Sequence, residues 1–449
     1  MYTIGKILFA TLLALSVCTD GLCTGATDRQ TRLIADAKLL VENIGHGKFE
    51  PVEARFDAKM SEALPLEKLR STSESIIAQA GEFTRVGDAQ VSEHDGYLIV
   101  LIDCEFAKAP LRAQVVYDAD DKVAGLFFKP REPTAYVSPE YVKESAFTER
   151  ETKVGMGVGA LAATLTLPNS TTPVAGVVLV HGSGPQDRDE TIGPNRVFRD
   201  IAWGLASRGI AVLRYEKRTK ALPESFSGDF TVDDETVNDA LAAAAMLRTS
   251  KEIDASSIFI AGHSLGAMMA PRIATRDNKL RGLILLAPPS RPLEDIVVDQ
   301  QKYMLGGESG KLEKAKSDSL ADVIRKRDEI KNLTTAKRPK QALFLDLPAS
   351  YWLDLRDYDA VAVAQKLALP ILVLQGERDF QVTAPDYARW KTLCAKQPRV
   401  TCTAYPALNH LFIAGTGRSD LAEYSKSGHV DPKVIGDIAA WIEHTHTAR

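Results

Sequence analysis

Several features that would place a sequence in a specialised class are missing here. No apolar run approaches the roughly 20 residues that a membrane-spanning helix needs, so no stable membrane span is expected. The net charge of −4 and the pI near 6.1 come without a basic stripe or a pattern of stacking aromatic residues, which argues against nucleic acid and anionic membranes as partners. No paired C-x-x-C and no H-E-x-x-H motif occurs, so the sequence gives no reason to propose zinc.

What is present is the composition of an ordinary globular protein, with 45% hydrophobic and 25% charged residues. A chain of 449 residues can bury a large core, and this length favours two or more domains. The patterns along the chain indicate an N-terminal targeting segment, a small first domain and a larger second domain.

The N-terminal segment is typical of an export signal. Lys6 provides a short positive region, and residues 7–17 form an apolar stretch that is too short to span a bilayer. Small residues at 24 and 26 fit a cleavage site, so we expect a signal peptide over residues 1–26 and a periplasmic or secreted mature chain. A lipoprotein signal ending at Cys18 is the alternative, although the residue before Cys18 is not small.

Of the five cysteines, three remain after the predicted signal peptide. Cys394 and Cys402 flank a short loop in a chain that we expect to be exported, so we predict a disulfide between them. Cys104 lies inside a strand-like run and is expected to be a buried core thiol.

Residues 27–130 are predicted to form a small α+β domain. Helical periodicity is followed by strand-like runs, in the order helix 33–44, helix 66–80, and strands 97–106, 111–117 and 123–128. Helices followed by a meander make a separate domain. It shows no catalytic constellation, and His94 is interpreted as a solvated loop histidine. Residues 131–145 are predicted to be a linker.

Residues 146–449 change to an alternation of strands and helices. Strand-like runs lie at 175–180, 210–215, 258–261, 283–287, 371–375 and 401–405, with helices predicted at 197–208, 232–247 and 432–444. This spacing implies right-handed crossovers and a mostly parallel, doubly covered sheet, which is an α/β fold. The charged, helix-prone segment at about 288–359 interrupts the alternation and is expected to form a helical cap over the strand ends, with Tyr351 and Trp352 packing inside it.

The glycines at 155, 157 and 159 superficially resemble a dinucleotide-binding loop. The strand-like run that follows them ends at Pro168, where such a loop would need a helix. A hairpin at the edge of the sheet explains these glycines better, and no cofactor is expected.

The second domain is organised around residues 258–269, IFIAGHSLGAMM, in which residues 262–266 match the G-x-S-x-G nucleophile elbow. A strand must reverse here into a helix within a residue or two, so a Cβ at either glycine would collide with neighbouring backbone. Ser264 is then held strained and exposed at the strand end. His263, inside the elbow, is expected to point away from the reacting face and to pack.

A serine nucleophile needs a base and an acid that orients the base. His410 follows a strand near the C-terminus, and Asp379 follows the strand at 371–375. Glu377 is the competing acid, but Asp379 is better placed in the loop. The order Ser264, Asp379, His410 is that of the α/β-hydrolases and differs from the orders of the two unrelated serine protease folds.

An oxyanion must also be stabilised. The loop HGSGP at 181–185 follows a buried strand, and its small residues let backbone approach a substrate carbonyl. The backbone N–H groups of Ser183 and Leu265 are therefore the candidate oxyanion hole. A mere glycine turn between strand and helix is the alternative interpretation.

Longer stretches resemble a known family. HGSGPQDRDETIGPNRVFRDIAWGLASRGIAVLRYEKR at 181–218, with GHSLG, LVLQGERDFQVT and YPALNHLF, resembles the α/β-hydrolase carboxylesterases of the EstD type over about residues 175–446. The resemblance implies a serine carboxylesterase for short acyl esters, with Ser264, Asp379 and His410 as the matching residues. Relatives often carry a small N-terminal domain, and they often have Asp where Glu216 stands here.

We therefore expect a two-domain α/β-hydrolase that cleaves small-molecule esters through an acyl-enzyme, without a cofactor. A peptidase or amidase remains open because the same constellation cleaves amides, although the N-terminal unit is too short for a β-propeller, which needs at least four blades. Acyl transfer is another alternative. A non-catalytic hydrolase-like binding protein is a further one, and the intact set of candidate residues argues against it. The sequence does not give the acyl and alcohol preference or the oligomeric state.

Overall fold

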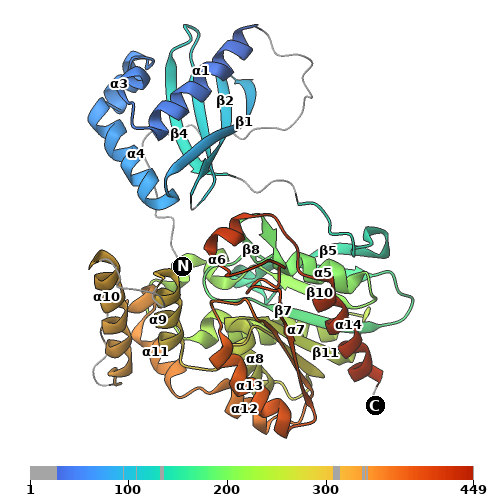
Figure 1. The fold of residues 1–449 in the computed structure, drawn as a ribbon. Helices are drawn as coiled ribbons and strands as arrows, with labels where there is room; N and C mark the ends of the chain where they lie inside the picture. The colour runs from blue at the N-terminus through green and yellow to red at the C-terminus, as the bar shows by residue number, and fades with distance from the viewer. Residues whose placement is uncertain are drawn as a thin grey trace. The chain divides into compact units, whose positions relative to one another are not determined.

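The computed structural model describes residues 28–94, 96–107, 109–131, 136–306, 314–335, 339 and 342–447 (Figure 1). The predicted signal peptide, with the alternative anchor at Cys18, lies outside these residues. By its internal contacts the chain divides into two compact units, residues 1–135 with Leu421–Ser425 and residues 136–420 with 426–449. The division falls inside the predicted linker of 131–145, and residues from Tyr136 onward belong to the second unit.

The first unit is a four-stranded antiparallel sheet that packs its core side against helices. Its elements are α1 (Asp28–Gly45), α2 (Glu50–Glu53), α3 (Ala58–Ala63), α4 (Leu66–Ala80), β1 (Phe83–His94), β2 (Tyr97–Phe106), β3 (Leu111–Tyr117) and β4 (Val123–Pro130). Alternate residues of β2, such as Leu98 and Val100, are fully buried in one core with Leu33 of α1. Cys104 shares this core as a free thiol, and burial raises its pKa to about 11.

The sequence pattern does not predict β1. Most of its side chains are exposed or only half-buried, so it shows little apolar periodicity. Two register shifts against β2, at Phe83/Arg85 and at Val86/Ala89, also break the alternation of faces. His94, predicted to lie in a turn, is the last residue of this strand and is exposed.

The second unit contains an eight-stranded sheet in the order β14-β13-β12-β11-β7-β10-β6-β5. Its strands are β5 (Phe147–Val154), β6 (Leu161–Pro168), β7 (Val174–Val180), β10 (Ala211–Tyr215), β11 (Ile253–His263), β12 (Gly282–Leu286), β13 (Ile371–Gly376) and β14 (Val400–Tyr405). The pairs from β14 through β10 are parallel, whereas β6 and β5 are antiparallel at one edge. The glycines from 155 to 159 lie in the β5–β6 connection, which confirms the edge hairpin.

Helices cover both faces of this sheet, as the sequence predicted (Figure 1). α5 (Val197–Ala206) and α14 (Pro432–Thr447) pack together, and Trp441 of α14 meets Phe259 of β11. α7 (Asn238–Thr249), α8 (Leu265–Arg276), α12 (Ala360–Lys366) and α13 (Ala384–Lys396) share a second core with alternate residues of the central strands. The remaining elements are β8 (Thr191–Ile192), β9 (Asn195–Arg196), α6 (Arg218–Ala221), a π-helical turn (Asp233–Val237), and short 3-10 turns at Glu144–Ala146, Gly157–Gly159, Pro223–Phe226, Phe344–Asp346 and Leu421–Ser425.

The predicted cap segment is helical. It contains α9 (Leu293–Met304), α10 (Lys314–Lys331) and α11 (Ala349–Arg356). Trp352 of α11 packs with Ile330, Leu333 and Phe344 in a small core of its own. Tyr351 and Trp352 are each 1% exposed, so both side chains pack, but Tyr351 joins the core of the eight-stranded sheet and only Trp352 joins that of the cap.

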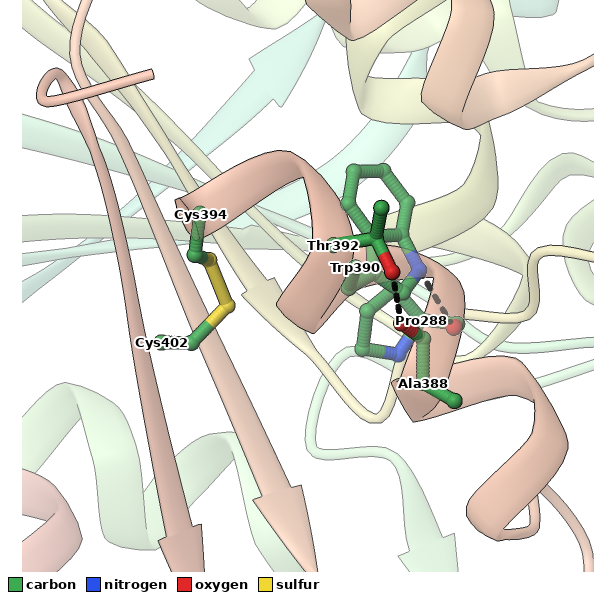
Figure 2. The surroundings of a disulfide bond; sticks show 6 residues. All are labelled: Pro288, Ala388, Trp390, Thr392, Cys394 and Cys402. Atoms are coloured by element: carbon green, nitrogen blue, oxygen red, sulfur yellow. Dashed lines mark hydrogen bonds between the residues drawn. A yellow bond between two sulfur atoms is a disulfide. The ribbon is translucent and has the colours of Figure 1, made fainter. Parts of the chain in front are cut away.

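A disulfide joins Cys394 at the end of α13 to Cys402 of β14, as the sequence predicted (Figure 2). On the same helix, the indole N–H of Trp390 donates to the carbonyl oxygen of Pro288 at 3.0 Å, where the cap segment begins. α13 is therefore tied to the edge strand β14 at one point and to the start of the cap at another. Among the described residues, no helix has the length and apolarity needed to cross a membrane.

Candidate active site

The nucleophile elbow has the strained geometry that the sequence predicted. Ser264 joins β11 directly to α8 with φ of 52°, a left-handed conformation that is costly for a residue with a side chain. Its backbone N–H donates to the carbonyl oxygen of Leu286 on the adjacent β12 at 2.9 Å, which holds the turn in place. Ser264 itself is half-buried, which is less exposed than the sequence predicted.

Both glycines of the elbow are required by close backbone contacts. A Cβ at Gly262 would lie 2.3 Å from the carbonyl carbon of Gly266, and a Cβ at Gly266 would lie 2.1 Å from the carbonyl oxygen of Val180. Real Cβ atoms do not approach backbone this closely. Replacement of either glycine would therefore push α8 away from β7 and β11.

Asp379 and His410 meet in the loops after β13 and β14. The Nδ1 atom of His410 lies 2.7 Å from Oδ2 of Asp379, and both side chains are at most 4% exposed. The other carboxylate oxygen of Asp379 accepts the backbone N–H groups of Gln381 and Val382 at 2.8 and 2.9 Å. A carboxylate held in this way places the imidazole proton on Nδ1 and leaves Nε2 available as a base. Glu377, the competing acid, is exposed.

The topology brings these loops to one edge of the sheet. β11, β13 and β14 are parallel, so Ser264, Asp379 and His410 all follow carboxyl ends of strands. The ring of His263, next to Ser264, lies 4.7 Å from the ring of His410, centroid to centroid. Within the part of the chain that the structure describes, no hydrogen bond joins the Ser264 hydroxyl to His410; such bonds often form only once substrate is bound.

The glycine-rich loop after β7 lies beside the elbow. A Cβ built on Gly182 would be 3.3 Å from Cβ of Ser264, which places this loop against the serine. Ser183 follows Gly182, and Leu265 is the first residue of α8. Both predicted N–H donors therefore come from residues adjoining the contact between the two loops.

His181, at the start of this loop, has a structural role. It is buried, and one ring nitrogen lies 3.0 Å from the carbonyl oxygen of Asp187. Burial lowers the pKa of His181 to about 4, so the ring is neutral at physiological pH.

Sequence reasoning missed three buried polar side chains around the loop. Glu190, Lys217 and His263 are each at most 2% exposed. Lys217 donates to the carbonyl oxygen of Gly182 at 2.7 Å and pairs with Glu235 at 2.8 Å. His263 was expected only to pack, yet its two ring nitrogens contact Glu190 and the carbonyl oxygen of His410. Charged residues are normally exposed, so composition alone gives no signal for them.

No metal site accompanies these residues in the described part of the chain. Three or more His, Cys, Asp or Glu side chains are nowhere grouped there in a way that could hold a metal ion.

Comparison with known proteins gives matches for both units. Residues 171–416 match the family described as serine aminopeptidase, S33, and residues 37–126 match a protein family of unknown function, DUF3887. Esterase EstD of Thermotoga maritima is 38% identical over 411 residues, which cover 91% of this chain and 94% of that protein. Among solved structures, Est1E from Butyrivibrio proteoclasticus aligns with a TM-score of 0.43 and 14% identity, covering 66% of this chain and 98% of Est1E. A hyperthermophilic esterase from Pyrobaculum calidifontis aligns with a TM-score of 0.43 and 18% identity, and the alignment covers 67% of this chain and 87% of that esterase.

Proposed function

The chain belongs to the α/β-hydrolase family of Esterase EstD, and we propose that it is a serine carboxylesterase that cleaves short-chain esters through an acyl-enzyme. The observation that carries the proposal is the buried pair of Asp379 and His410, held 2.7 Å apart at the strand edge where the strained Ser264 projects. A neutral histidine oriented by a carboxylate beside a strained serine is the arrangement that activates a hydroxyl nucleophile.

In the proposed reaction, Ser264 Oγ attacks the ester carbonyl carbon and its proton moves to Nε2 of His410. The backbone N–H groups of Ser183 and Leu265 stabilise the negative oxygen of the tetrahedral intermediate. Collapse of the intermediate breaks the bond to the alcohol oxygen, which takes the proton from His410. A water molecule, deprotonated by His410, then attacks the acyl-enzyme, and the acid is released as Ser264 regains its proton.

Peptide cleavage is the second candidate, because the family matched by residues 171–416 is described as serine aminopeptidase. The same site chemistry would serve both reactions. Turnover of p-nitrophenyl acetate compared with that of an aminoacyl p-nitroanilide separates the two, and we expect a large preference for the ester. Adding a competing alcohol and looking for a new ester tests acyl transfer in the same assay.

Labelling with a fluorophosphonate tests the nucleophile directly. We expect one adduct on Ser264 by mass spectrometry, and Ser264→Ala should lower turnover of p-nitrophenyl acetate by about 10⁴-fold or more, as loss of a triad serine does. Ser256→Ala, an exposed serine on the same strand, is the matched control. A folded Ser264→Ala enzyme with near-normal turnover would refute the assignment. Activity that falls as the acyl chain lengthens from acetate to decanoate would support the short-chain preference.

We also propose that the mature chain is exported. The Cys394–Cys402 disulfide supports this, since structural disulfides persist in oxidising compartments. Mass measurement of the mature protein is expected to show loss of residues 1–26. Retention of Cys18 with a covalent lipid would instead establish the lipoprotein alternative.

A further inference from the structure

Glu190 is a buried carboxylate that the proposed mechanism does not use. It lies in the turn between the glycine-rich loop and β8, it is 1% exposed, and its φ of 48° is a left-handed conformation that is unfavourable for glutamate. Burial of a charge and a strained backbone both cost free energy. The surrounding structure must therefore hold Glu190 in this position.

The two oxygens of Glu190 face two different parts of the site. Oε1 accepts the backbone N–H of Gly182 at 2.7 Å, in the loop that supplies the proposed oxyanion donor Ser183. Oε2 lies 2.9 Å from Nδ1 of His263, the residue before the nucleophile. One side chain thus connects the glycine-rich loop to the elbow.

His263 extends this connection to the loop of the proposed base. Its Nε2 lies 2.9 Å from the backbone carbonyl oxygen of His410. A carbonyl oxygen only accepts hydrogen bonds, so Nε2 of His263 carries a proton. Nδ1 faces a carboxylate, which also accepts. With an acceptor at each nitrogen, the ring is best satisfied as an imidazolium that donates on both sides.

The electrostatic surroundings agree with this protonation state. Burial opposes the charged ring, but the carboxylate of Glu190 and its hydrogen bond raise the pKa of His263 above its ordinary value. Burial likewise opposes the carboxylate of Glu190, but the charge and hydrogen bond of His263 hold the pKa of Glu190 below its ordinary value. Gly182 is held by side chains at both of its backbone polar groups: its N–H donates to Glu190, and its carbonyl oxygen accepts from Lys217.

We propose that Glu190 and His263 are positioning residues, which form a buried carboxylate–imidazolium bridge that fixes the oxyanion loop relative to the loop of His410. The inference rests on the proposed function, because it assigns these two loops their roles. Neither side chain touches the reacting atoms; each acts through backbone, Glu190 through Gly182 and His263 through His410. Losing the bridge should misplace the oxyanion donor and the base together.

Kinetics of two Glu190 variants separate the hydrogen bonds from the charge. Glu190→Ala removes both contacts, so we expect kcat for p-nitrophenyl acetate to fall by about 100-fold while KM stays within about threefold, because displacement by about an ångström costs this much. Glu190→Gln can still accept from Gly182 and donate to a neutral His263, so we expect a loss of less than about tenfold. Glu216→Gln, a partly buried glutamate on the neighbouring β10 loop that pairs with Arg188, is the matched control. Each kcat is divided by the fraction of enzyme titrated by fluorophosphonate.

Nitrogen NMR of histidine-labelled protein tests the bridge without any activity measurement. At about pH 8.5 an ordinary histidine is neutral, whereas His263 should give the signal of a ring with two protonated nitrogens. His263→Asn identifies the signal by its disappearance, and Glu190→Gln should convert it to a ring with one proton.

A singly protonated His263 in the wild-type protein, or Glu190→Ala with the kcat of Glu216→Gln, would overturn the proposal. If Glu190→Ala does not fold, Glu190→Gln and the NMR signal still decide it. Failure of fluorophosphonate to label Ser264 in the wild-type enzyme would instead count against the proposed function, and the NMR result would stand apart from it.

Discussion

The two sheets of this chain differ in how deeply their paired charged side chains are buried. At the carboxyl edge of the eight-stranded sheet, charged and polar side chains are buried and paired, namely Asp379 with His410, Glu190 with His263, and Lys217 with Glu235. In the four-stranded sheet and its helices, ion pairs are more exposed: Arg32 is 62% exposed where it meets Asp121, and Arg112 is 26% exposed where it meets Asp103. Burial of an ion costs several kcal/mol. A cluster of buried ion pairs at one edge of a sheet is therefore a candidate functional site.

Strand direction explains the difference. Parallel strands end at one edge, so loops far apart in the sequence converge there, as those carrying Ser264, Asp379 and His410 do. In an antiparallel meander, successive strands end at opposite edges, so the turns are divided between the two edges. Fewer loops therefore meet at either edge of the four-stranded sheet.

The largest expected effect tests whether the buried charges at the carboxyl edge serve catalysis, and it is expected at Asp379. Asp379→Asn keeps the shape of the side chain but can donate to Nδ1 of His410, which turns the imidazole to the wrong tautomer. We expect kcat for p-nitrophenyl acetate to fall by about 10⁴-fold, as in serine enzymes with this change. Glu377→Gln, two residues away and exposed, should leave kcat unchanged. Equal activities of the two variants would mean that the buried carboxylate has no catalytic role.

The core of the catalytic unit could be predicted because its strands are buried on both faces. Runs such as 175–180 and 371–374 are continuously apolar, and the structure places β7 and β13 there. The two glycines of the elbow could also be predicted, since the close contacts of Gly262 and Gly266 follow from a strand–serine–helix turn. Short-range geometry and burial on both faces of a strand can therefore be recognised in a single sequence.

Features that depend on pairing between distant residues leave no such trace. Glu190 reads as one acidic residue in a polar stretch, and only the fold brings it to His263, 73 positions away. Strand β1 was missed for a related reason, because an edge strand with exposed side chains carries no apolar alternation. The Asp379–His410 pair was predicted from the order of the motifs in the chain, and only the structure gives its distance.

The disulfide gives the next largest expected effect, on stability and not on catalysis. Cys394 and Cys402 close a short loop at the edge of the catalytic sheet. Removing a disulfide that closes a loop of this size lowers the free energy of unfolding by about 2–3 kcal/mol in the chain-entropy model. We expect the double variant Cys394→Ala, Cys402→Ala to lose this much free energy of unfolding in denaturant titrations while keeping kcat. Reduction of the wild-type protein should give the same loss, and a fall in kcat would show that α13 also supports the active site.

A smaller effect, dependent on pH, is expected at His429. Its Nδ1 lies 3.2 Å from the buried carboxylate of Asp200, which raises the pKa of His429 above its ordinary value. A raised pKa in the folded state means that the stabilisation is fully present below about pH 6.5 and is lost as pH rises through the folded-state pKa. His429→Gln should therefore destabilise the protein more at about pH 5.5 than at about pH 9. A difference between variant and wild type that does not change with pH would show that the pair is not charged.

The smallest effect is expected at a surface pair of the first unit. Arg32 is 62% exposed where it meets Asp121, and Asp121 also pairs with Arg29. Exposed ion pairs contribute about 0–1 kcal/mol, so Arg32→Ala should change the free energy of unfolding by less than about 1 kcal/mol and leave kcat unaltered. A loss of more than about 2 kcal/mol in the free energy of unfolding would mean that this surface pair stabilises the fold as much as we expect only of a buried pair. A change in kcat would mean that the first unit takes part in the reaction. The burial of charged side chains would then no longer distinguish the sheet that carries the proposed active site from the other sheet.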